Sequence, residues 1–385
     1  MTTFNAYIKR FIAIFCIVIS HPTIAGPSTQ NMPFFKPSPP KLESPAFLLF
    51  DINSKKILAE KNANEKVEPA SLTKMMTVYV VDAEVRAGRV KLTDKVTISK
   101  NAWKAPGSRM FLEIGSHIPV IDLIRGTIIL SGNDASIALA EHIAGSERAF
   151  SDLMNQHAAQ LNMTDTHFVN ATGLPNPDHY TSAKDMGILA SALIKNFPES
   201  YEIYSEKSFE HQGIKQFNRN RLLWKNAKVD GIKTGHTDNA GYCLVASGIK
   251  DNMRLIAVVM GAKNDDARTH ETNRLLTWGF RFYETHKLYQ AKEKLQSIRV
   301  WLGEKNDLNV GVEDDLYITI TQGQYSQLKA SVNLPKVIKA PLTNKQPIGT
   351  LSIAMGDEVL MEKPLVALAP IKKGSLWGRL TDTIT

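Results

Sequence analysis

Short apolar runs bounded by turn residues occur in two regions that lie far apart along the chain. The runs PAFLLFD (45–51) and KKILAEKN (55–62) are separated by Ile52-Asn53-Ser54, which favours an antiparallel hairpin. After Asp230 come GIKTGHT, GYCLVASGI and MRLIAVVMGA, with turn residues between them. We expect these three runs to form consecutive antiparallel strands.

The residues between the two strand regions follow a helical period. Pro69 suits the entry of a helix and Gly88 its exit, around an apolar run that begins Ala-Ser-Leu-Thr-Lys. Further helices are expected at about 119–130, 134–144, 146–162 and 182–195, and from Asp266 to His286. Strands at both ends of a helical middle predict a three-layer α/β domain, an antiparallel sheet with helices, over residues 43–290.

The C-terminal part of the chain has a different pattern. Residues 291–364 contain short apolar alternations and many turn residues, which predict a small all-β domain. For residues 365–385 we expect an amphipathic, membrane-associating tail, with a frayed terminus as the alternative. On a helix one apolar face would hold Leu376, Trp377, Leu380 and Ile384.

The N-terminal stretch has the pattern of an export signal. Lys9 and Arg10 precede a short apolar run, and Thr23-Ile24-Ala25 provides small residues for cleavage after Ala25. The apolar run is short for a bilayer span, which argues against an uncleaved anchor. Residues 1–25 are therefore predicted to be a signal peptide, and the proline-rich residues 26–42 an extended linker.

Composition and charge narrow the classes of partner and of chemistry. The formal net charge of +8 favours anionic surfaces such as membranes or wall polymers. No zinc-finger spacing or basic-aromatic motif is present, so nucleic acid is not an expected partner, and the absence of H-E-x-x-H argues against a zinc peptidase. Cys243 lies in an expected strand with no base beside it in sequence, so a buried structural thiol is predicted rather than a nucleophile.

A serine and a lysine at the start of the first expected helix could perform acyl transfer. Ser71 and Lys74 are three residues apart, so they share one face of a helix. A desolvated lysine can lose its proton near neutral pH and act as a base for the hydroxyl. The same spacing recurs at Ser38, Ser247 and Ser326, but only Ser71 has a helical context.

Two further motifs supply groups that such a reaction needs. Ser131-Gly132-Asn133 lies between two expected helices, where a hydroxyl and a carboxamide could face one cleft. Lys233-Thr234-Gly235 lies on an expected strand and combines a positive charge, a hydroxyl for a carboxylate and a side-chain-free edge. Their order along the chain is more specific than any one motif.

Together these motifs resemble the active-site set of the penicillin-binding proteins and serine β-lactamases. The similarity extends to the low-molecular-mass D-alanyl-D-alanine carboxypeptidases over about residues 42–290, through RMFLEIG, SGNDAS, NRNRLLW, VDGIKTGHT, MRLIAVVMGAK and LLTWGFRFYET. It implies a β-lactamase/transpeptidase-like domain followed by a small β domain. It also implies export to the periplasmic face of the bacterial inner membrane, peptidoglycan stem peptides as substrates, β-lactams as covalent inhibitors, and no cofactor.

The resemblance also implies a role for each residue. Ser71 would attack the carbonyl between the two terminal D-alanines, Lys74 would take its proton, and Ser131 would relay a proton to the leaving amine. Backbone N–H groups of Ser71 and His236 would hold the oxyanion. The stem peptide and its terminal carboxylate would be bound by Asn133, Lys233, Thr234, Gly235 and Arg268.

Three alternatives remain open from the sequence. A class A β-lactamase would want a glutamate in the loop 171–181, which offers only Asp178. An endopeptidase that cleaves peptidoglycan cross-links would use the same chemistry. A catalytically weak penicillin-binding, wall-associated module is the third alternative.

Overall fold

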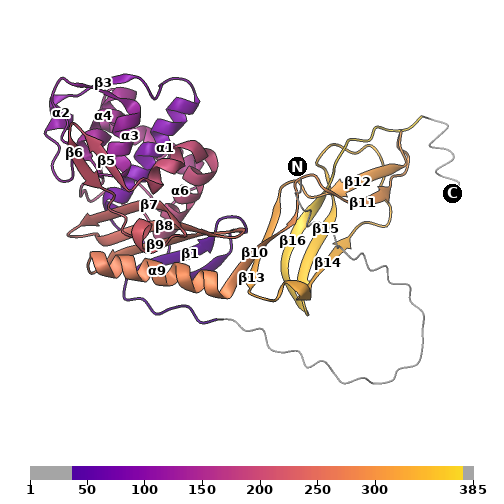
Figure 1. Ribbon diagram of the computed structural model, residues 1–385. Helices are drawn as coiled ribbons and strands as arrows, with labels where there is room; N and C mark the ends of the chain where they lie inside the picture. Colours follow the sequence, from indigo (N-terminus) through magenta and orange to yellow (C-terminus); the bar gives the residue numbers. More distant parts are fainter. Residues whose placement is uncertain (1–36, 376–385) are drawn as a thin grey trace, which may run out of the picture. The chain divides into compact units, whose positions relative to one another are not determined.

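The computed structural model describes residues 37–375, and the first part of this range is built on a five-stranded antiparallel sheet (Figure 1). The sheet order is β2-β1-β9-β8-β7. Its strands are β1 (Ala46–Asp51), β2 (Ile57–Lys61), β7 (Val229–Thr237), β8 (Gly241–Lys250) and β9 (Met253–Ala262). The expected hairpin and the three later strands are all present, and β1 pairs with β9 along its whole length.

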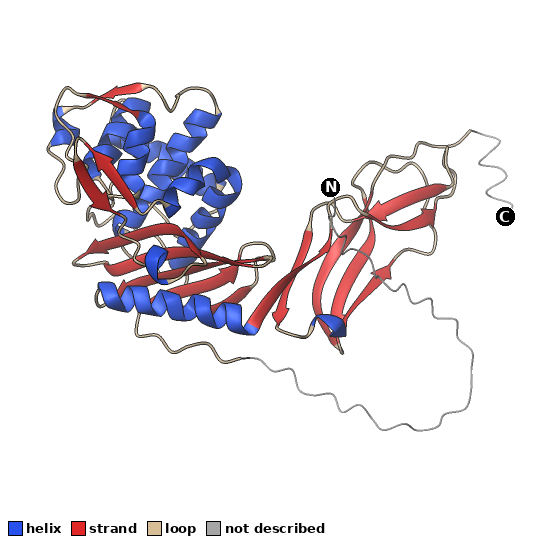
Figure 2. Ribbon diagram, in the orientation of Figure 1, coloured by secondary structure: helices blue, strands red, loops and turns tan. Residues whose placement is uncertain are grey.

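Helices cover both faces of this sheet (Figure 2). The long helices are α1 (Thr73–Arg86), α3 (Val120–Ile128), α4 (Asn133–Ala144), α5 (Glu147–Gln160), α6 (Ala183–Asn196) and α9 (Asp265–Phe282). Side chains alternate along each strand, so Val245 and Val258 pack against the helical cluster that contains α1, while Leu244 and Val259 pack with α9. The three-layer α/β prediction is confirmed.

Shorter elements, which the sequence analysis did not identify, connect these layers. They are η1 (Ala70–Leu72), β3 (Lys95–Thr97), α2 (Lys100–Trp103), β4 (His117–Pro119), α7 (Pro198–Tyr201), η2 (Glu202–Ser205), β5 (Ser208–His211), β6 (Ile214–Phe217) and α8 (Leu222–Lys225). β3 pairs with β4, and β5 with β6, as two-stranded hairpins. Each of these elements is short, so its pattern of apolar and polar residues is too brief to predict it from the sequence.

The end of the last long helix was predicted wrongly. The helix α9 ends at Phe282, whereas it was expected to continue to His286. Residues 283–286 instead belong to β10 (Tyr283–Tyr289), which pairs with β13 (Leu316–Thr321). The pairing places Thr285 in a buried site, where it hydrogen-bonds Thr319, and such a contact with a strand distant in sequence overrides a local helical period.

The C-terminal part is all β, as predicted. A second five-stranded sheet has the order β11-β12-β16-β15-β14. Its elements are β11 (Lys294–Arg299), β12 (Asp307–Gly311), β14 (Leu328–Asn333), β15 (Pro347–Met355) and β16 (Glu358–Ala367), with the short η3 (Tyr325–Gln327) before β14. β16 extends to Ala367, and Ile371 forms a further bridge with Leu342, inside the segment expected to be a tail.

Several expectations concern residues that the structure does not describe. The export signal at 1–25, most of the linker at 26–42 and the apolar face of the tail lie outside the described residues. Within residues 37–375, no helix combines the length and apolar character needed to cross a bilayer.

Candidate active site

The Ser71–Lys74 pair lies where the turn η1 leads into α1. Pro69 precedes this turn, and Leu72 N–H donates to its carbonyl, so the chain enters the helix through a tight 3-10 turn. Lys74 follows in the first turn of α1, and its Nζ lies 3.0 Å from Ser71 Oγ. The amine is therefore within hydrogen-bond reach of the hydroxyl, as a general base must be.

The surroundings of Lys74 make its amine a base near neutral pH. Its side chain is only 1% exposed, and burial lowers its pKa to about 7, while the negative charges of Asp134 and Glu147 oppose that shift. The Nζ also donates to the carbonyl of Thr172 at 2.5 Å. Close to neutral pH a large fraction of these amines is unprotonated and able to accept a proton from Ser71.

Ser131 and Lys233 form a second pair. Ser131 lies in the connection between α3 and α4 with a positive φ of 59°, and its side chain is buried. Lys233, on β7, donates from Nζ to Ser131 Oγ at 2.9 Å and to the Thr234 carbonyl at 3.0 Å. Burial, and then the positive charges of Lys74 and Arg268, lower the pKa of Lys233 well below its ordinary value. The permanent charge expected for this lysine is therefore disfavoured unless an anion binds near it.

Asn133 begins α4 directly after this turn. Its side-chain Nδ2 donates to the carbonyl of Pro106 at 2.6 Å, and its backbone N–H donates to Ser108. The next residue, Asp134, is fully buried and accepts hydrogen bonds from the backbone N–H groups of Met110 and Leu112. These bonds fix the loop 106–112 beside the Ser131 turn.

The strand β7 passes close to the Ser71 turn at Gly235. A Cβ on Gly235 would lie 3.0 Å from the Pro69 carbonyl oxygen and 3.2 Å from the Leu72 nitrogen. A side chain at this position would therefore force one of the two backbone segments to move. This close approach favours glycine here for a different reason than the side-chain-free edge for substrate that the sequence predicts. Thr234 is buried beside Gly235, and the exposed His236 follows with its ring centroid 3.9 Å from that of Tyr242.

Arg268 reaches this strand from α9. Its Nη1 donates to the carbonyls of Gly235 and Cys243, at 2.9 and 3.4 Å. The predicted residues from the three motifs and Arg268 therefore come together where η1, the turn before α4, β7 and α9 meet. Ser71 and Lys74 form one pair, Lys233 and Ser131 another, and each lysine lies within electrostatic range of the other.

Groups from α5 and from the loop 169–173, which are not evident from the sequence, also surround Lys74. Asn170 Oδ1 accepts from the backbone N–H groups of Thr172 and Gly173, which holds the Thr172 carbonyl against the lysine. Glu147, in the first turn of α5, accepts from Ala171 N–H, and burial raises its pKa. A backbone carbonyl has no residue-type signature, so only the local Asn-x-x-Gly turn pattern could have suggested this arrangement.

A buried histidine supports the start of α1. Val169 N–H donates to His179 Nδ1, so the proton is assigned to Nε2, which donates to Thr73 Oγ1 at 2.8 Å. Burial, together with the positive charges of His167 and Lys74, lowers the pKa of His179 to about 4. The ring is therefore neutral and orients the helix start rather than transferring protons.

Other candidate features lie apart from this constellation. Cys243 is fully buried, and burial raises the pKa of its thiol to about 11, so it is an inert thiol as predicted. Asp178, the acid considered for a β-lactamase, is exposed.

A cavity of about 710 Å³ lies around Asp82 and Phe197 at the other end of α1 and includes no predicted site residue. Among residues 37–375, no group of three or more His, Cys, Asp or Glu side chains is placed to hold a metal ion.

Comparison with known proteins gives two family matches. Residues 34–264 match the family described as D-alanyl-D-alanine carboxypeptidase, and residues 283–375 match the penicillin-binding protein 5 C-terminal domain. Among curated proteins, D-alanyl-D-alanine carboxypeptidase DacA of Escherichia coli (strain K12) is 42% identical over 392 residues, covering 100% of this chain and 97% of the relative. DacC of the same strain is 45% identical over 353 residues, covering 90% of this chain and 88% of the relative.

A solved structure shows the same architecture. Penicillin binding protein 5 from Haemophilus influenzae superposes with a TM-score of 0.85 and 42% sequence identity, covering 87% of this chain and 99% of that one. The likeness therefore extends over both the α/β part and the C-terminal β part.

Proposed function

This chain belongs to the D-alanyl-D-alanine carboxypeptidase family, and on that basis we propose how its residues divide the reaction. It is a serine-type D-Ala-D-Ala carboxypeptidase, a hydrolase that removes the terminal D-alanine from peptidoglycan stem pentapeptides. It is also a penicillin-binding protein, which means that β-lactams acylate its reactive serine. The main support for assigning Ser71 as the nucleophile and Lys74 as its base is the distance of 3.0 Å between Lys74 Nζ and Ser71 Oγ.

In the first step Ser71 Oγ attacks the carbonyl carbon between the two terminal D-alanines, and Lys74 accepts its proton. The pKa of about 7 for Lys74 supports this role, because the neutral amine is available at the pH at which the reaction must run. Backbone N–H groups of Ser71 and His236 stabilise the oxyanion, and loss of one such donor typically costs about 10²–10³ in rate. The C–N bond then breaks, which leaves the acyl group on Ser71.

The departing D-alanine needs a proton on its amine, and Ser131 relays it. The hydrogen bond from Lys233 to Ser131 supports this role, since it fixes the hydroxyl of Ser131 beside Lys233, which itself lies near Lys74. Thr234 and Arg268 bind the terminal carboxylate, Gly235 lets the peptide lie along β7, and Asn133 binds the stem peptide. Lys233 adds positive charge once the carboxylate is present. Water then hydrolyses the acyl-enzyme and releases the tetrapeptide.

We further propose that the chain is exported and acts at the periplasmic face of the inner membrane. Lys9 and Arg10 before an apolar run, with small residues up to Ala25, support export. The alternation of Leu376, Trp377 and Leu380 with basic residues supports peripheral contact of the tail with the membrane. Fractionation of cells that express the chain with and without residues 376–385 tests the second statement, which fails if both forms sediment equally with membranes.

A matched pair of serine variants tests the catalytic assignment. Ser71→Ala is compared with Ser326→Ala, because Ser326 has a lysine at the same spacing but is exposed. Each purified protein is incubated with a labelled penicillin and, separately, with a pentapeptide ending in D-Ala-D-Ala. We expect covalent label and free D-alanine from the parent and from Ser326→Ala, and neither from Ser71→Ala.

Other outcomes point to the alternatives. Cleavage of cross-linked dimers alone indicates the endopeptidase, and label without any peptide cleavage indicates a weak binding module. Persistent label on Ser71→Ala refutes the nucleophile assignment.

A further inference from the structure

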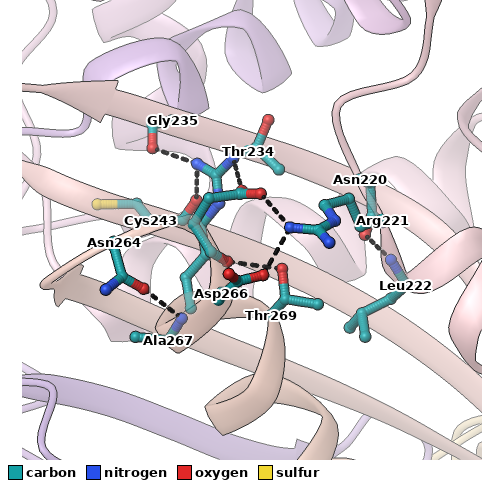
Figure 3. Close-up of polar contacts among 12 residues, drawn as sticks. Asn220, Arg221, Leu222, Thr234, Gly235, Cys243, Asn264, Asp266, Ala267 and Thr269 are labelled. Atoms are coloured by element: carbon teal, nitrogen blue, oxygen red, sulfur yellow. Dashed lines mark hydrogen bonds and ion pairs between the residues drawn. The ribbon is translucent and has the colours of Figure 1, made fainter.

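Arg268 donates to the carbonyls of Gly235 and Cys243, which are labelled in Figure 3, and it has a further partner on α9. Its side chain is 9% exposed, and its Nη2 forms an ion pair with Asp265 Oδ1 at 2.5 Å, one turn earlier on α9. Asn264 caps this helix by accepting from Ala267 N–H, which fixes Asp265 in the first turn. The Nε of Arg268 is buried and has no hydrogen-bond partner among the described residues.

Asp265 is shared with a second arginine. Arg221, which precedes α8, donates from Nη1 to Asp265 Oδ2 at 2.9 Å and to Asp266 Oδ1 at 2.7 Å. Burial alone would raise the pKa of Asp265, but its hydrogen bond to Arg221 and the charge of Arg268 lower that pKa below its ordinary value. Asp265 is therefore a permanent anion between two guanidinium groups.

The charges around Arg268 determine how strongly it attracts an approaching carboxylate. The three groups Arg221, Asp265 and Arg268, which we call the arginine clamp, have a net charge of +1. Asp266 is 80% exposed, and solvent screens its charge. Without Arg221 the carboxylate of Asp265 would offset the charge of Arg268 and weaken the attraction of Arg268 for another carboxylate.

The clamp also borders an open space. A cavity of about 530 Å³ is lined by Phe217, Arg219 and Tyr242 together with Arg221 and Arg268. Arg268 therefore lines the same cavity as Arg221 and Asp265, so a carboxylate bound to Arg268 from this cavity would experience the charge of Arg221.

We propose that Asp265 and Arg221 are positioning residues for recognition of the substrate carboxylate. Asp265 holds Nη2 of Arg268 in place, and Arg221 compensates the charge of Asp265 so that Arg268 still attracts the terminal carboxylate of the peptide. This inference rests on the proposed role of Arg268. It assigns a function to a charge network outside the three motifs.

The experiment measures kcat and KM for release of D-alanine from a D-Ala-D-Ala pentapeptide. Arg221→Ala is expected to raise KM about 3- to 10-fold and to leave kcat within about twofold, since it alters charge at the carboxylate and not at Ser71. Arg221→Lys keeps the charge and should stay within about twofold of the parent KM. Asp266→Ala is the matched control, because it removes the other partner of Arg221 without touching Arg268, and its KM should not rise.

The Arg268→Ala variant, alone and combined with Arg221→Ala, distinguishes a failure of the clamp from a failure of the proposed role of Arg268. Arg268→Ala should itself raise KM; if it does not, the role of Arg268 is wrong and the inference fails with it. If Arg268→Ala raises KM but Arg221→Ala does not, the role of Arg268 stands and the clamp is refuted. The clamp is also refuted if Arg221→Ala adds the same increment in the Arg268→Ala background, or if Arg221→Lys is as impaired as Arg221→Ala. Penicillin labelling of Ser71 in every variant verifies that the site is folded.

Discussion

Replacing Lys74 by methionine should abolish activity and yet stabilise the protein. In the folded chain the pKa of this buried amine is about 7, compared with 10.5 for an ordinary lysine. The folded state therefore binds the proton more weakly than the unfolded state does. Below pH 7 the full difference applies, and at about 1.4 kcal/mol per unit it destabilises the parent by about 5 kcal/mol.

The size of the effect depends on pH in a defined direction. Between pH 7 and 10.5 only the unfolded chain holds the proton, so the stability of the parent rises with pH by up to about 1.4 kcal/mol per unit. Methionine has a similar length and no charge, but it loses the hydrogen bonds to Ser71 and Thr172, at a cost of about 1–3 kcal/mol. At pH 7 the protonation penalty is about 4 kcal/mol, so Lys74→Met should be about 1–3 kcal/mol more stable than the parent. Near pH 9 the penalty has fallen to about 2 kcal/mol, so the variant should lie within about 1 kcal/mol of the parent.

Urea unfolding followed by tryptophan fluorescence at several pH values measures this difference. Lys104→Met is the control, since Lys104 is exposed and should show no such pH-dependent gain. The reasoning is refuted if Lys74→Met is less stable than the parent at pH 7, or if its advantage does not shrink between pH 7 and pH 9. The result matters for function because it measures the free energy by which the folded protein disfavours protonation of the amine beside Ser71.

Three further outcomes follow from the site. The rate of acylation by a penicillin should fall about tenfold per pH unit well below pH 7, as Lys74 becomes protonated, and a flat profile in stopped-flow labelling between pH 5 and 7 would contradict its role as base. Gly235→Ala should lower acylation at least about tenfold, because the new Cβ meets Pro69 and Leu72 at 3.0–3.2 Å, and unchanged labelling kinetics would show that the turn can move away. Asp134→Ala should cost about 2–4 kcal/mol in urea unfolding, since two loop N–H groups lose their acceptor, and a loss below about 1 kcal/mol would mean that water replaces the carboxylate.

The parts of the fold predicted from sequence are those with a strong local signal. The strands around Cys243 and the helix after Ser71 have long apolar runs bounded by Pro, Gly or Asn, so their type follows from local chemistry. The stretch 283–286 was misassigned because it continues the helical period of α9, whereas its partner strand lies at 316–321. Nothing local indicates a pairing between segments so far apart in sequence.

The same distinction applies to the site. Ser71, Lys74, Ser131 and Lys233 could be proposed from the sequence because each belongs to a short motif, and the structure brings them together in pairs. The Thr172 carbonyl escaped prediction because backbone groups are alike in every residue. Asp265 escaped because its significance depends on Arg221, which is remote in sequence and lies beside it only in the folded chain.

The burial of Lys233 has a consequence for the thermodynamics of binding. Burial, and then the positive charges of the nearby Lys74 and Arg268, lowers the pKa of this amine well below its ordinary value. A carboxylate docking beside it reverses that balance, so association of substrate is coupled to proton uptake from solution. The heat of binding, measured by calorimetry on Ser71→Ala to prevent turnover, should therefore change with the ionisation enthalpy of the buffer. The affinity for carboxylate ligands should therefore weaken as the solution becomes alkaline, so pH itself would adjust how much substrate the enzyme binds.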